Sequence, residues 1–421
     1  MDAMDSERTI LNDPQITKFS LYGFFKNLKF FEPYLLIYLL ANGLNLFQVG
    51  ILQALMEGTV YLLEIPTGLI ADHYGRKRSL VASFLFYIIS FVLFFAGRSF
   101  SLYAAAMVFF GIGEAFRSGT HKAMIYRYLD LREWESFKTL VYGRTRSFSL
   151  LGTALSSVAA IALALHLPAL RTIFLVAVIP YLADILLILS YPGNLDEERS
   201  PAMQPVTLFS FSGDLFRSLV RHRALRRVLT NSALFDSVFK TVKDYIQPIT
   251  LAYLTLPAAW LFVMDKETGD KVVLGLLYGA FALFGALASR YVHRLVPRFG
   301  VAELANRYTV ATGLLFFSIA LLLGLGSFFP VILLYLFLNI LKDSRRPLLV
   351  HAIGDLASKE GRATILSVES QLKSLFTVLF APLFGLLAQT VSIPFAFFIL
   401  GCIMALLSFA LKLEETKGGS V

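Results

Sequence analysis

The chain has 421 residues, of which 57% are hydrophobic and 16% are charged, and its formal net charge is +9. A soluble protein has about a quarter of its residues charged, so this composition, with a mean hydropathy of +0.67, indicates a chain that lies in a lipid bilayer. Its single cysteine, Cys402, excludes an intrachain disulfide and a cysteine-based zinc site. The basic residues lie mostly between apolar segments, so they indicate membrane topology rather than nucleic-acid binding.

Twelve apolar segments follow one another along the chain. Each is long enough to cross the roughly 30 Å hydrocarbon core of a bilayer as a helix, and each is too long for a membrane β-strand, whose signal covers roughly ten residues. We therefore predict an all-α membrane protein with twelve transmembrane helices. The predicted spans are residues 17–46, 48–71, 79–97, 101–127, 140–165, 171–191, 231–262, 272–296, 304–327, 329–353, 363–389 and 391–412.

The basic residues also indicate how the helices are oriented. They concentrate in the connections after the second, sixth, eighth and tenth spans, whereas the opposite connections hold few of them. Because positively charged loops stay on the cytoplasmic side, both termini are predicted to be cytoplasmic. The first segment, residues 1–14, is polar and acidic and does not resemble a cleaved signal peptide.

One long hydrophilic segment, residues 192–230, separates six spans from six. We expect it to be a cytoplasmic linker between an N-terminal six-helix bundle, residues 1–191, and a C-terminal one, residues 231–421. Transporters built from repeated units place their substrate site between the repeats, near the bilayer midplane. Three short patterns recur in the same order in both halves and favour a duplicated unit: Glu32-Pro33 and Gln247-Pro248, Arg117 and Arg345, and Arg144-x4-Ser149 and Arg362-x4-Ser367.

The end of the second span carries a recognisable motif. Residues 68–78 read Gly-Leu-Ile-Ala-Asp-His-Tyr-Gly-Arg-Lys-Arg. Gly68 allows helices to pack closely, and Gly75 permits a tight turn. Asp72 can lie against a helix N-terminus and nearby arginines, while the basic triplet holds the loop on the cytoplasmic side.

This motif resembles the signature Gly-x-x-x-Asp-x-x-Gly-Arg-Lys/Arg of the major facilitator superfamily, which lies between the second and third helices. The resemblance implies two pseudo-symmetric six-helix bundles that move a small solute by alternating access, and we expect a monomer. In the second half Gly285 remains, but Ser289 stands where the aspartate would be. The resemblance also implies that the loop is a conformational latch between the halves in the outward-open state, formed by Gly68, Asp72, Gly75, Arg76 and Lys77, with Arg362 as a partner.

Residues 64–68, Glu-Ile-Pro-Thr-Gly, resemble a bacterial branch of the family that is associated with drug and multidrug transport. The resemblance implies a multi-pass protein of the bacterial inner membrane, and it raises efflux as a function. Residues 151–155 of the fifth span read Leu-Gly-Thr-Ala-Leu and lack the Gly-Pro-x-x-Gly-Gly of drug–proton antiporters. Efflux of an amphiphilic compound and transport of an anion therefore both stay open.

Acidic groups inside the apolar spans are candidates for function, because an ionisable side chain at the bilayer centre costs several kcal/mol. Glu32 in the first span, Glu57 in the second and Asp184 in the sixth are candidate proton carriers or substrate ligands. Glu32 can also pair locally with Lys29, three residues earlier. Glu64, nearer the motif, is expected to be structural.

The seventh span carries a polar stripe on one helix face. Its members are Asp236, Lys240, Lys243, Asp244 and Gln247. Opposite charges four residues apart permit pairing along the helix. A stripe of this kind suits the wall of a water-filled cavity, so Lys240, Lys243 and Gln247 are expected to lie on the transport pathway.

Basic side chains predominate among the expected pathway residues, which also include Arg117, Arg345 and Arg346. Planar guanidinium groups suit carboxylate or phosphate, so an anionic substrate is one interpretation. The other is that the cations neutralise carboxylates in structural networks. Glu369 and Lys373, four residues apart in the eleventh span, are expected pathway residues that can pair with each other or across helices.

Other functional classes lack their motifs. There is no His-x-x-x-x-Asp, no metal-ligand cluster and no nucleophile elbow, so we expect neither an enzyme nor a metal nor a cofactor. There is no Walker motif either, so the energy is expected to come from a gradient, and protons are the expected coupling ion. The alternatives are a gradient-independent facilitator, a transporter of lipid-like solutes and a transporter-like sensor. The expected partners are a small-molecule substrate, protons and the lipid bilayer, and not nucleic acid.

Overall fold

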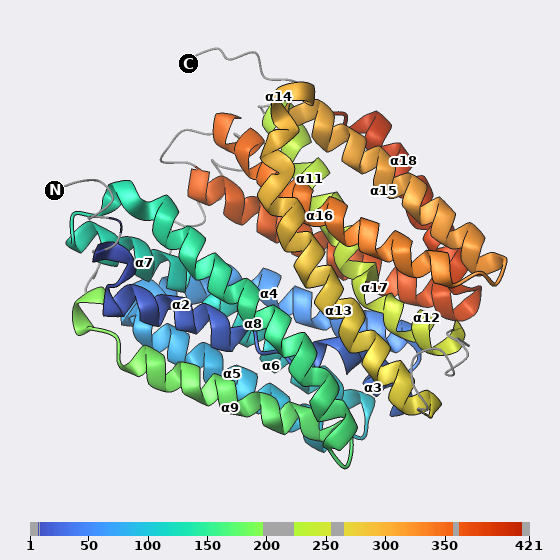
Figure 1. Cartoon of the computed structure of the whole chain (residues 1–421), viewed down its shortest axis with the longest axis horizontal. Helices are drawn as coiled ribbons and strands as arrows, with labels where there is room; N and C mark the ends of the chain where they lie inside the picture. The colour runs from blue at the N-terminus through green and yellow to red at the C-terminus, as the bar shows by residue number, and fades with distance from the viewer. Residues whose placement is uncertain (1–6, 8, 197–222, 254–264, 357–361, 415–421) are drawn as a thin grey trace. The chain divides into compact units, whose positions relative to one another are not determined.

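The computed structural model describes Glu7 and residues 9–196, 223–253, 265–356 and 362–414, and the regular secondary structure of these residues is helical (Figure 1). Nine helices in these ranges are long and apolar enough to cross a membrane. The predicted all-α membrane fold is confirmed. Most of the predicted linker, residues 197–222, lies outside the described residues.

The helices before the linker follow the predicted spans in order. They are α2 (Pro14–Lys26) with the 3₁₀ turn η1 (Glu32–Tyr34) and α3 (Leu35–Ala41), α4 (Leu46–Tyr74), α5 (Arg76–Ala96), α6 (Phe100–Arg117) with α7 (Thr120–Leu131), α8 (Lys138–His166) and α9 (Thr172–Leu189).

The helices after the linker also follow the predicted spans. They are α11 (Arg223–Val242) with the 3₁₀ turn η4 (Lys243–Tyr245) and α12 (Ile246–Tyr253), α13 (Lys266–Tyr291), the short α14 (Val296–Phe299), α15 (Val301–Gly324), α16 (Phe329–Leu356), α17 (Arg362–Thr390) and α18 (Ile393–Ala410).

Three predicted spans are not continuous helices. The span 17–46 is interrupted between α2 and η1, where Asn27 leaves the helical conformation and Pro33 supplies no amide donor. The span 101–127 is interrupted at Gly119, whose φ of +72° is a left-handed conformation that costs glycine little. The span 231–262 is interrupted by η4. The predicted continuity was wrong because apolar composition does not reveal a local break in the helix.

The tenth predicted span, residues 329–353, is present as α16, which continues through Pro347. Its middle carries Lys342, Asp343, Arg345 and Arg346. This helix is therefore not among the nine identified by apolar composition. Charged groups at such a position need partners from neighbouring helices.

The chain forms two compact units, each built from discontinuous stretches. The first unit contains Met1–Tyr38, Gly58–Ala202 and Lys271–Gly279, and the second contains the remaining residues. Boundaries therefore fall inside α3, inside α4 and inside α13. The predicted bundles, residues 1–191 and 231–421, stay a prediction.

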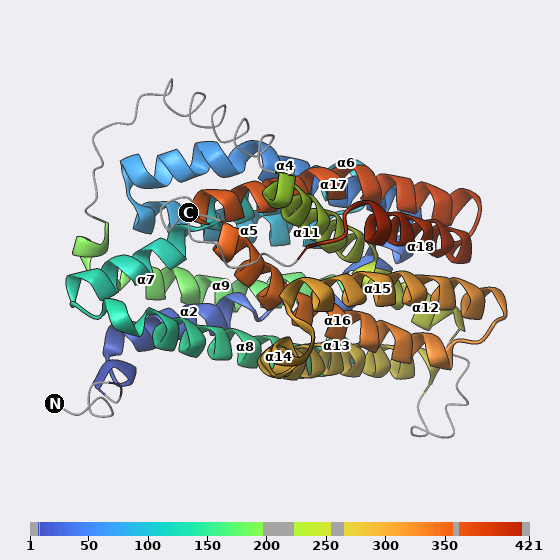
Figure 2. The same ribbon diagram turned by 90° about the horizontal axis from the view of Figure 1, so that it is seen from above.

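In the first unit, α5 packs against α6 and α9, and α2 packs along α8 (Figure 2). Glycine permits the close approach of α2 and α8. A Cβ on Gly23 would lie 2.5 Å from Ser149 Oγ, and a Cβ on Gly152 would collide with the carbonyl oxygen of Phe24. Small residues at a helix crossing are the usual way for membrane helices to pack closely.

In the second unit, α15 packs against α18 and α16, and α11 packs against α17. The first turns of α4 lie against the last turns of α17 through a second pair of glycines. A Cβ on Gly50 would collide with the carbonyl of Ala381, and a Cβ on Gly385 would collide with that of Leu46. These contacts fix the N-terminal part of α4, which carries Glu57, against α17.

Candidate functional site

Arg117 lies on the last turn of α6, directly before the break at Gly119. Its guanidinium forms an ion pair with Glu114, one turn earlier, at 2.5 Å, and its Nε donates to the hydroxyl of Tyr87 on α5 at 3.1 Å. A cation is favoured at the C-terminus of a helix. The break in the predicted fourth span therefore places Arg117 at a helix end, where two side chains hold it.

Two lysines from the break after α2 lie near the same carboxylate. Lys29 Nζ is 4.0 Å from Glu114 Oε1 and 5.4 Å from the ring centre of Phe110. The ion pair of Lys29 is therefore with another helix, and the local pair with Glu32 is not formed. Lys26, the last residue of α2, interacts electrostatically with this group, but its ammonium forms no hydrogen bond or ion pair with the described residues.

Asp184 on α9 belongs to the same unit. Its side chain is fully buried, and neither carboxyl oxygen has a hydrogen-bond partner among the described residues. The ammonium of Lys26 acts on it electrostatically. Since a buried carboxylate without a partner is costly, Asp184 stays a candidate proton carrier.

Two further acidic residues of the first unit are Glu32 and Glu64, and Glu32 acts electrostatically on Tyr181 of α9 together with Glu114 and Asp184. Glu32 begins η1, directly before Pro33. Glu64 accepts a hydrogen bond from Ser118 Oγ at 2.6 Å, and Ser118 is the residue that ends α6. Glu64 therefore supports the break beside Gly119, in agreement with the structural role expected for it.

Aromatic side chains pack together beside these charges in the first unit. His121 on α7 stacks on Tyr22 with ring centres 3.6 Å apart, and its Nε2 lies 3.3 Å from the hydroxyl of Tyr191, which follows α9. Burial raises the pKa of Tyr191 well above its ordinary value. The phenol therefore stays neutral at physiological pH and holds the imidazole by a hydrogen bond.

Glu57 lies on α4 within the second unit, and its side chain is 1% exposed. It forms an ion pair with Lys240 of α11 and accepts a hydrogen bond from Ser374 Oγ of α17 at 2.9 Å. Gln53, one turn earlier, donates to the backbone carbonyl of Lys240 at 2.8 Å. One buried carboxylate thus joins three helices. The pairing of Lys240 along its own helix, which the sequence permitted, is not formed.

Two other acidic residues of this unit, Asp236 and Glu369, share one arginine. Arg346 Nη1 lies 3.6 Å from Asp236 Oδ2 and forms an ion pair with Glu369. Ser232 donates to Glu369 Oε1 at 2.5 Å. Glu369 thus pairs across helices, which is one of the two alternatives the sequence left open, because the neighbouring helix offers a guanidinium. Lys373 forms no ion pair with the described residues.

Arg345, the next residue along α16, has a different environment. It is 1% exposed, its guanidinium lies 4.0 Å from the ring centre of Phe235, and it donates to Asn231 Oδ1. Its Nε and Nη1 have no hydrogen-bond partner among the described residues. Arg117 and Arg345, which the repeat pattern makes equivalent, therefore differ, because only Arg117 has a carboxylate partner in the described chain.

The remaining polar residues of the predicted stripe lie at the break after α11. Lys243 pairs with Asp244 at 3.6 Å within η4, and Gln247 is fully buried in α12. On α16, Lys342 pairs with Asp343 at 2.8 Å. The carboxyl group of Asp343 occupies the space that a side chain at Gly285 of α13 would need.

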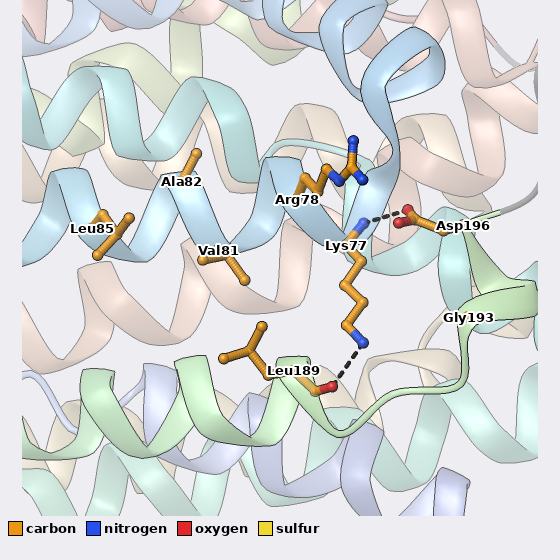
Figure 3. A pocket seen from close by; sticks show the side chains of 8 residues that line it. All are labelled: Lys77, Arg78, Val81, Ala82, Leu85, Leu189, Gly193 and Asp196. Carbon is orange, nitrogen blue, oxygen red and sulfur yellow. Dashed lines mark hydrogen bonds between the residues drawn. The ribbon is translucent and has the colours of Figure 1, made fainter.

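The loop after α4 contains the predicted tight turn at Gly75, whose φ is +104°. A Cβ on Gly75 would lie 2.7 Å from Asp196 Oδ1, which accepts a hydrogen bond from the backbone amide of Lys77 at 2.8 Å (Figure 3). The ammonium of Lys77 donates to the carbonyls of Leu189 and Tyr191 at 2.7 and 2.9 Å. Asp196 therefore caps α5, and Lys77 caps α9.

A groove of about 470 Å³ lies between these two capped helix ends (Figure 3). Its wall is apolar along α5, and its basic end is formed by the first turn of that helix. The lining residues are Lys77, Arg78, Val81, Ala82, Leu85, Leu189, Gly193 and Asp196.

Of the other residues of the predicted latch, Gly68 and Asp72 lie on α4 and Arg76 begins α5. Asp72 is half-exposed and pairs with Arg76 at 3.4 Å. A Cβ on Gly68 would meet no described atom within 4 Å, and close helix packing at Gly68 stays a prediction. Arg362 begins α17, but its side chain lies outside the described residues.

The structure thus sorts the predicted residues into two groups, one in each unit. Sequence reasoning missed several partners of these charges: Lys26, Tyr87, Asn231, Ser374 and Asp196. Lys26 could have been found from its spacing, since it lies three residues before Lys29 at the end of the same helical pattern. The others are neutral or lie far away in the sequence, and no local pattern marks them.

An all-α membrane protein with ionised side chains held between its spanning helices has the architecture of a transporter. The sequence model of the Major Facilitator Superfamily matches residues 19–251 and 249–420 of the chain. The chain belongs to the Major Facilitator Superfamily. It is a multi-pass membrane transporter of that family and not an enzyme.

Among curated proteins, the chain is similar to the uncharacterized MFS-type transporter YxaM of Bacillus subtilis (strain 168). The two are 29% identical over 97 residues, which are 23% of this chain and 24% of YxaM. The match therefore spans about a quarter of the length of that relative.

Solved structures share the fold over nearly the whole chain. The nucleoside transporter NupG has a TM-score of 0.73 at 9% identity, and the match covers 95% of this chain and 98% of NupG. A POT family transporter in complex with 5-aminolevulinic acid has a TM-score of 0.75 at 14% identity, covering 94% and 95%. A D-xylose–proton symporter has a TM-score of 0.73 at 14% identity, covering 96% and 99%. At these identities the likeness shows the fold alone.

Proposed function

We propose that this chain is a secondary active transporter that couples the movement of a small organic anion to protons, and that Glu57 carries the proton. The observation that supports this is the ion pair of the buried Glu57 with Lys240. Lys240 has no other ion pair among the described residues. Protonation of Glu57 therefore leaves the ammonium of Lys240, whose side chain is 32% exposed, without its ion-pair partner.

Once Glu57 is protonated, an anionic substrate can replace it as the counter-charge of Lys240. This exchange determines whether the proton and the anion move in the same direction. The anion binds better when Glu57 is protonated, so the proton and the anion cross the membrane together. Efflux by antiport, which residues 64–68 suggested, needs the opposite relation, in which the substrate replaces the proton. The direction of proton movement during substrate transport distinguishes symport from antiport.

The setting of this transport is part of the proposal. The positively charged connections support an orientation with both termini in the cytoplasm of a bacterial cell. We place the protein in the inner membrane, where a proton gradient is available, and expect it to act as a monomer. Alternating access then requires that the Glu57–Lys240 pair change its protonation on each cycle.

The test measures proton entry into proteoliposomes that contain trapped pyranine, while organic carboxylates are added outside one at a time. The wild type should acidify the lumen with a transported carboxylate. Glu57→Gln, which keeps the hydrogen-bonding shape but cannot ionise, should lose this acidification and still exchange labelled carboxylate across the membrane. Glu303→Gln, which removes an exposed carboxylate on α15, is the matched control and should behave as the wild type.

Acidification by Glu57→Gln at the wild-type rate would show that the proton travels elsewhere, with Asp184 as the next candidate. Alkalinisation on addition of substrate would indicate antiport and would favour efflux.

A further inference from the structure

The groove between α5 and α9 has a charged end and an apolar length (Figure 3). The residues that α5 contributes beyond Lys77 are Arg78, Val81, Ala82 and Leu85. They lie three, four and seven positions apart, so they share one face of the helix. Leu189, the last residue of α9, lines the opposite wall. The groove therefore runs from the basic first turn of α5 toward the apolar part of the same helix.

The basic end of the groove has more positive than negative charge. Arg78 is exposed and forms no hydrogen bond or ion pair with the described residues. The ammonium of Lys77 donates to two backbone carbonyls, and Asp196 accepts from the backbone amide of Lys77. The lining residues thus carry two positive charges and one negative charge, and the neighbouring Arg76 and Asp72 pair with each other. A group with a single negative charge would balance this end.

The apolar part of the groove opens onto exposed apolar surface. Leu85 and Leu189 are each about half exposed, and the exposed side chains continue one turn further along each helix with Ile89 on α5 and Leu186 on α9. Both helices are long and apolar enough to cross a membrane. Exposed apolar faces of such helices contact the acyl chains of the bilayer. The space beside Leu85 is therefore continuous with lipid hydrocarbon.

The length of the groove suits part of an acyl chain. From Arg78 to Leu85 the helix rises about 10 Å, whereas one leaflet contributes about 15 Å to the hydrocarbon core. An acyl chain whose phosphate contacts Arg78 therefore fills the groove with its upper part and continues into the bilayer beyond Leu85.

We propose that this groove binds an anionic phospholipid of the cytoplasmic leaflet. The phosphate accepts hydrogen bonds from the guanidinium of Arg78 and from the remaining donor of the Lys77 ammonium, and one acyl chain lies along Val81, Ala82 and Leu85. In the predicted orientation this end of the protein faces the cytoplasm, where basic pockets between transmembrane helices bind anionic headgroups. The bound lipid bridges the first turn of α5 and the last turn of α9, and it does not depend on the proposed proton coupling.

The test measures which lipid lies beside α5 when the full chain is reconstituted into phosphatidylcholine vesicles. In a Cys402→Ser background, Ile89→Cys carries a bimane fluorophore directly beyond the groove, and lipids with brominated acyl chains quench it on contact. Brominated phosphatidylglycerol and brominated phosphatidylcholine with the same chains differ in headgroup charge. Half-maximal quenching should need about fivefold less phosphatidylglycerol, as expected for one additional cation–phosphate contact at the membrane surface.

Four variants locate the preference. Arg78→Gln should abolish it, whereas Arg78→Lys keeps the charge and should retain most of it. Ala82→Phe fills the groove and should abolish the preference although both cations remain. Arg298→Gln, which removes an exposed arginine of another connection, is the matched control and should behave as the wild type.

A second reporter position separates this groove from the bilayer in general. Leu321 on α15 is 63% exposed and is not among the residues that line the groove, so a fluorophore on Leu321→Cys should be quenched equally by the two lipids. Glycerol 3-phosphate, which has the charge without an acyl chain, should not relieve the quenching at Ile89→Cys.

Several results would overturn the proposal. Equal quenching of Ile89→Cys by the two lipids would show that no anionic lipid is preferred there, as would an equal preference at Leu321→Cys. A preference that survives Arg78→Gln or Ala82→Phe, or that Arg298→Gln reduces as much as Arg78→Gln does, would show that the lipid is not held in this groove. Relief of quenching by glycerol 3-phosphate would assign the basic end to a free phosphate instead of a lipid.

Discussion

Two adjacent arginines of α16 differ in their contacts: Asp236 and Glu369 act electrostatically on Arg345, but they lie within ion-pair distance of Arg346 alone among these two. Arg346 is the ion-pair partner of Glu369, which is fully buried, and it also lies near Asp236. Arg345 is itself buried, with a ring face and one amide oxygen as its neighbours. The first arginine therefore compensates buried negative charge, and the second carries an incompletely satisfied positive charge.

This difference predicts opposite effects on stability. Arg346→Gln should lower the free energy of unfolding by about 3 kcal/mol or more, because it leaves Glu369 buried without its counter-charge. Arg345→Gln should be neutral or stabilising, because it removes a buried group whose donors are only partly satisfied. Thermal unfolding of the purified variants measures both. A larger loss for Arg345→Gln than for Arg346→Gln would show that Arg345 has a counter-charge in the folded protein.

The positions of the charged residues could be predicted from the sequence, but their partners could not. Glu57, Asp184 and Arg345 stand out because ionisable groups are rare in apolar spans. Spacing along one helix suggested Glu369–Lys373 as a pair, whereas the structure gives Glu369 a guanidinium from another helix. A charged side chain in apolar surroundings pairs with the nearest well-oriented opposite charge, which can lie on another helix. Spacing in the sequence reveals only the neighbours on the same helix.

At the level of helices, sequence reasoning located the spans well and missed their interruptions. Apolar composition determines which segments prefer the bilayer, so the positions of α4, α5 and α9 follow from it. Breaks at Asn27 and Gly119 depend on single backbone conformations inside segments of suitable composition. These breaks place Lys29 and Arg117 at helix ends beside Glu114. The interruptions that composition missed therefore bring these charged side chains together.

The turn before α5 gives a prediction about one such backbone conformation. Gly75→Ala should lower the free energy of unfolding by about 1–3 kcal/mol, because φ of +104° is strained for alanine and the new methyl group would meet Asp196. Gly193→Ala is the matched control, since its Cβ would meet no described atom within 4 Å. Thermal unfolding of both variants tests the prediction. Equal stability of the two would show that the loop relaxes without cost.

For the whole molecule, orientation in the membrane is the property that sequence alone predicts and the fold does not test. Arg98 precedes α6 and Arg132 follows α7, and both are exposed. The predicted topology places Arg98 outside the cell and Arg132 in the cytoplasm.

The single native cysteine makes this testable. In a Cys402→Ser background, a membrane-impermeant maleimide applied to intact cells should label Arg98→Cys and leave Arg132→Cys unlabelled. After the cells are permeabilised, both should react. Labelling of Arg132→Cys alone in intact cells would invert the predicted orientation.

The contact between Gly75 and Asp196 has a consequence for how this sequence can evolve. Asp196 accepts from the backbone amide of residue 77, and every amino acid except proline provides that amide. The hydrogen bond therefore places little selection on the side chain at position 77 and much on positions 75 and 196. Because the carboxyl group of Asp196 fills the space beside Gly75, a smaller residue at position 196 would remove the steric part of the cost of a larger residue at position 75, while the backbone strain at φ of +104° would remain. The two positions, far apart in the sequence, are thus epistatic, and the order of substitutions decides which evolutionary paths remain open.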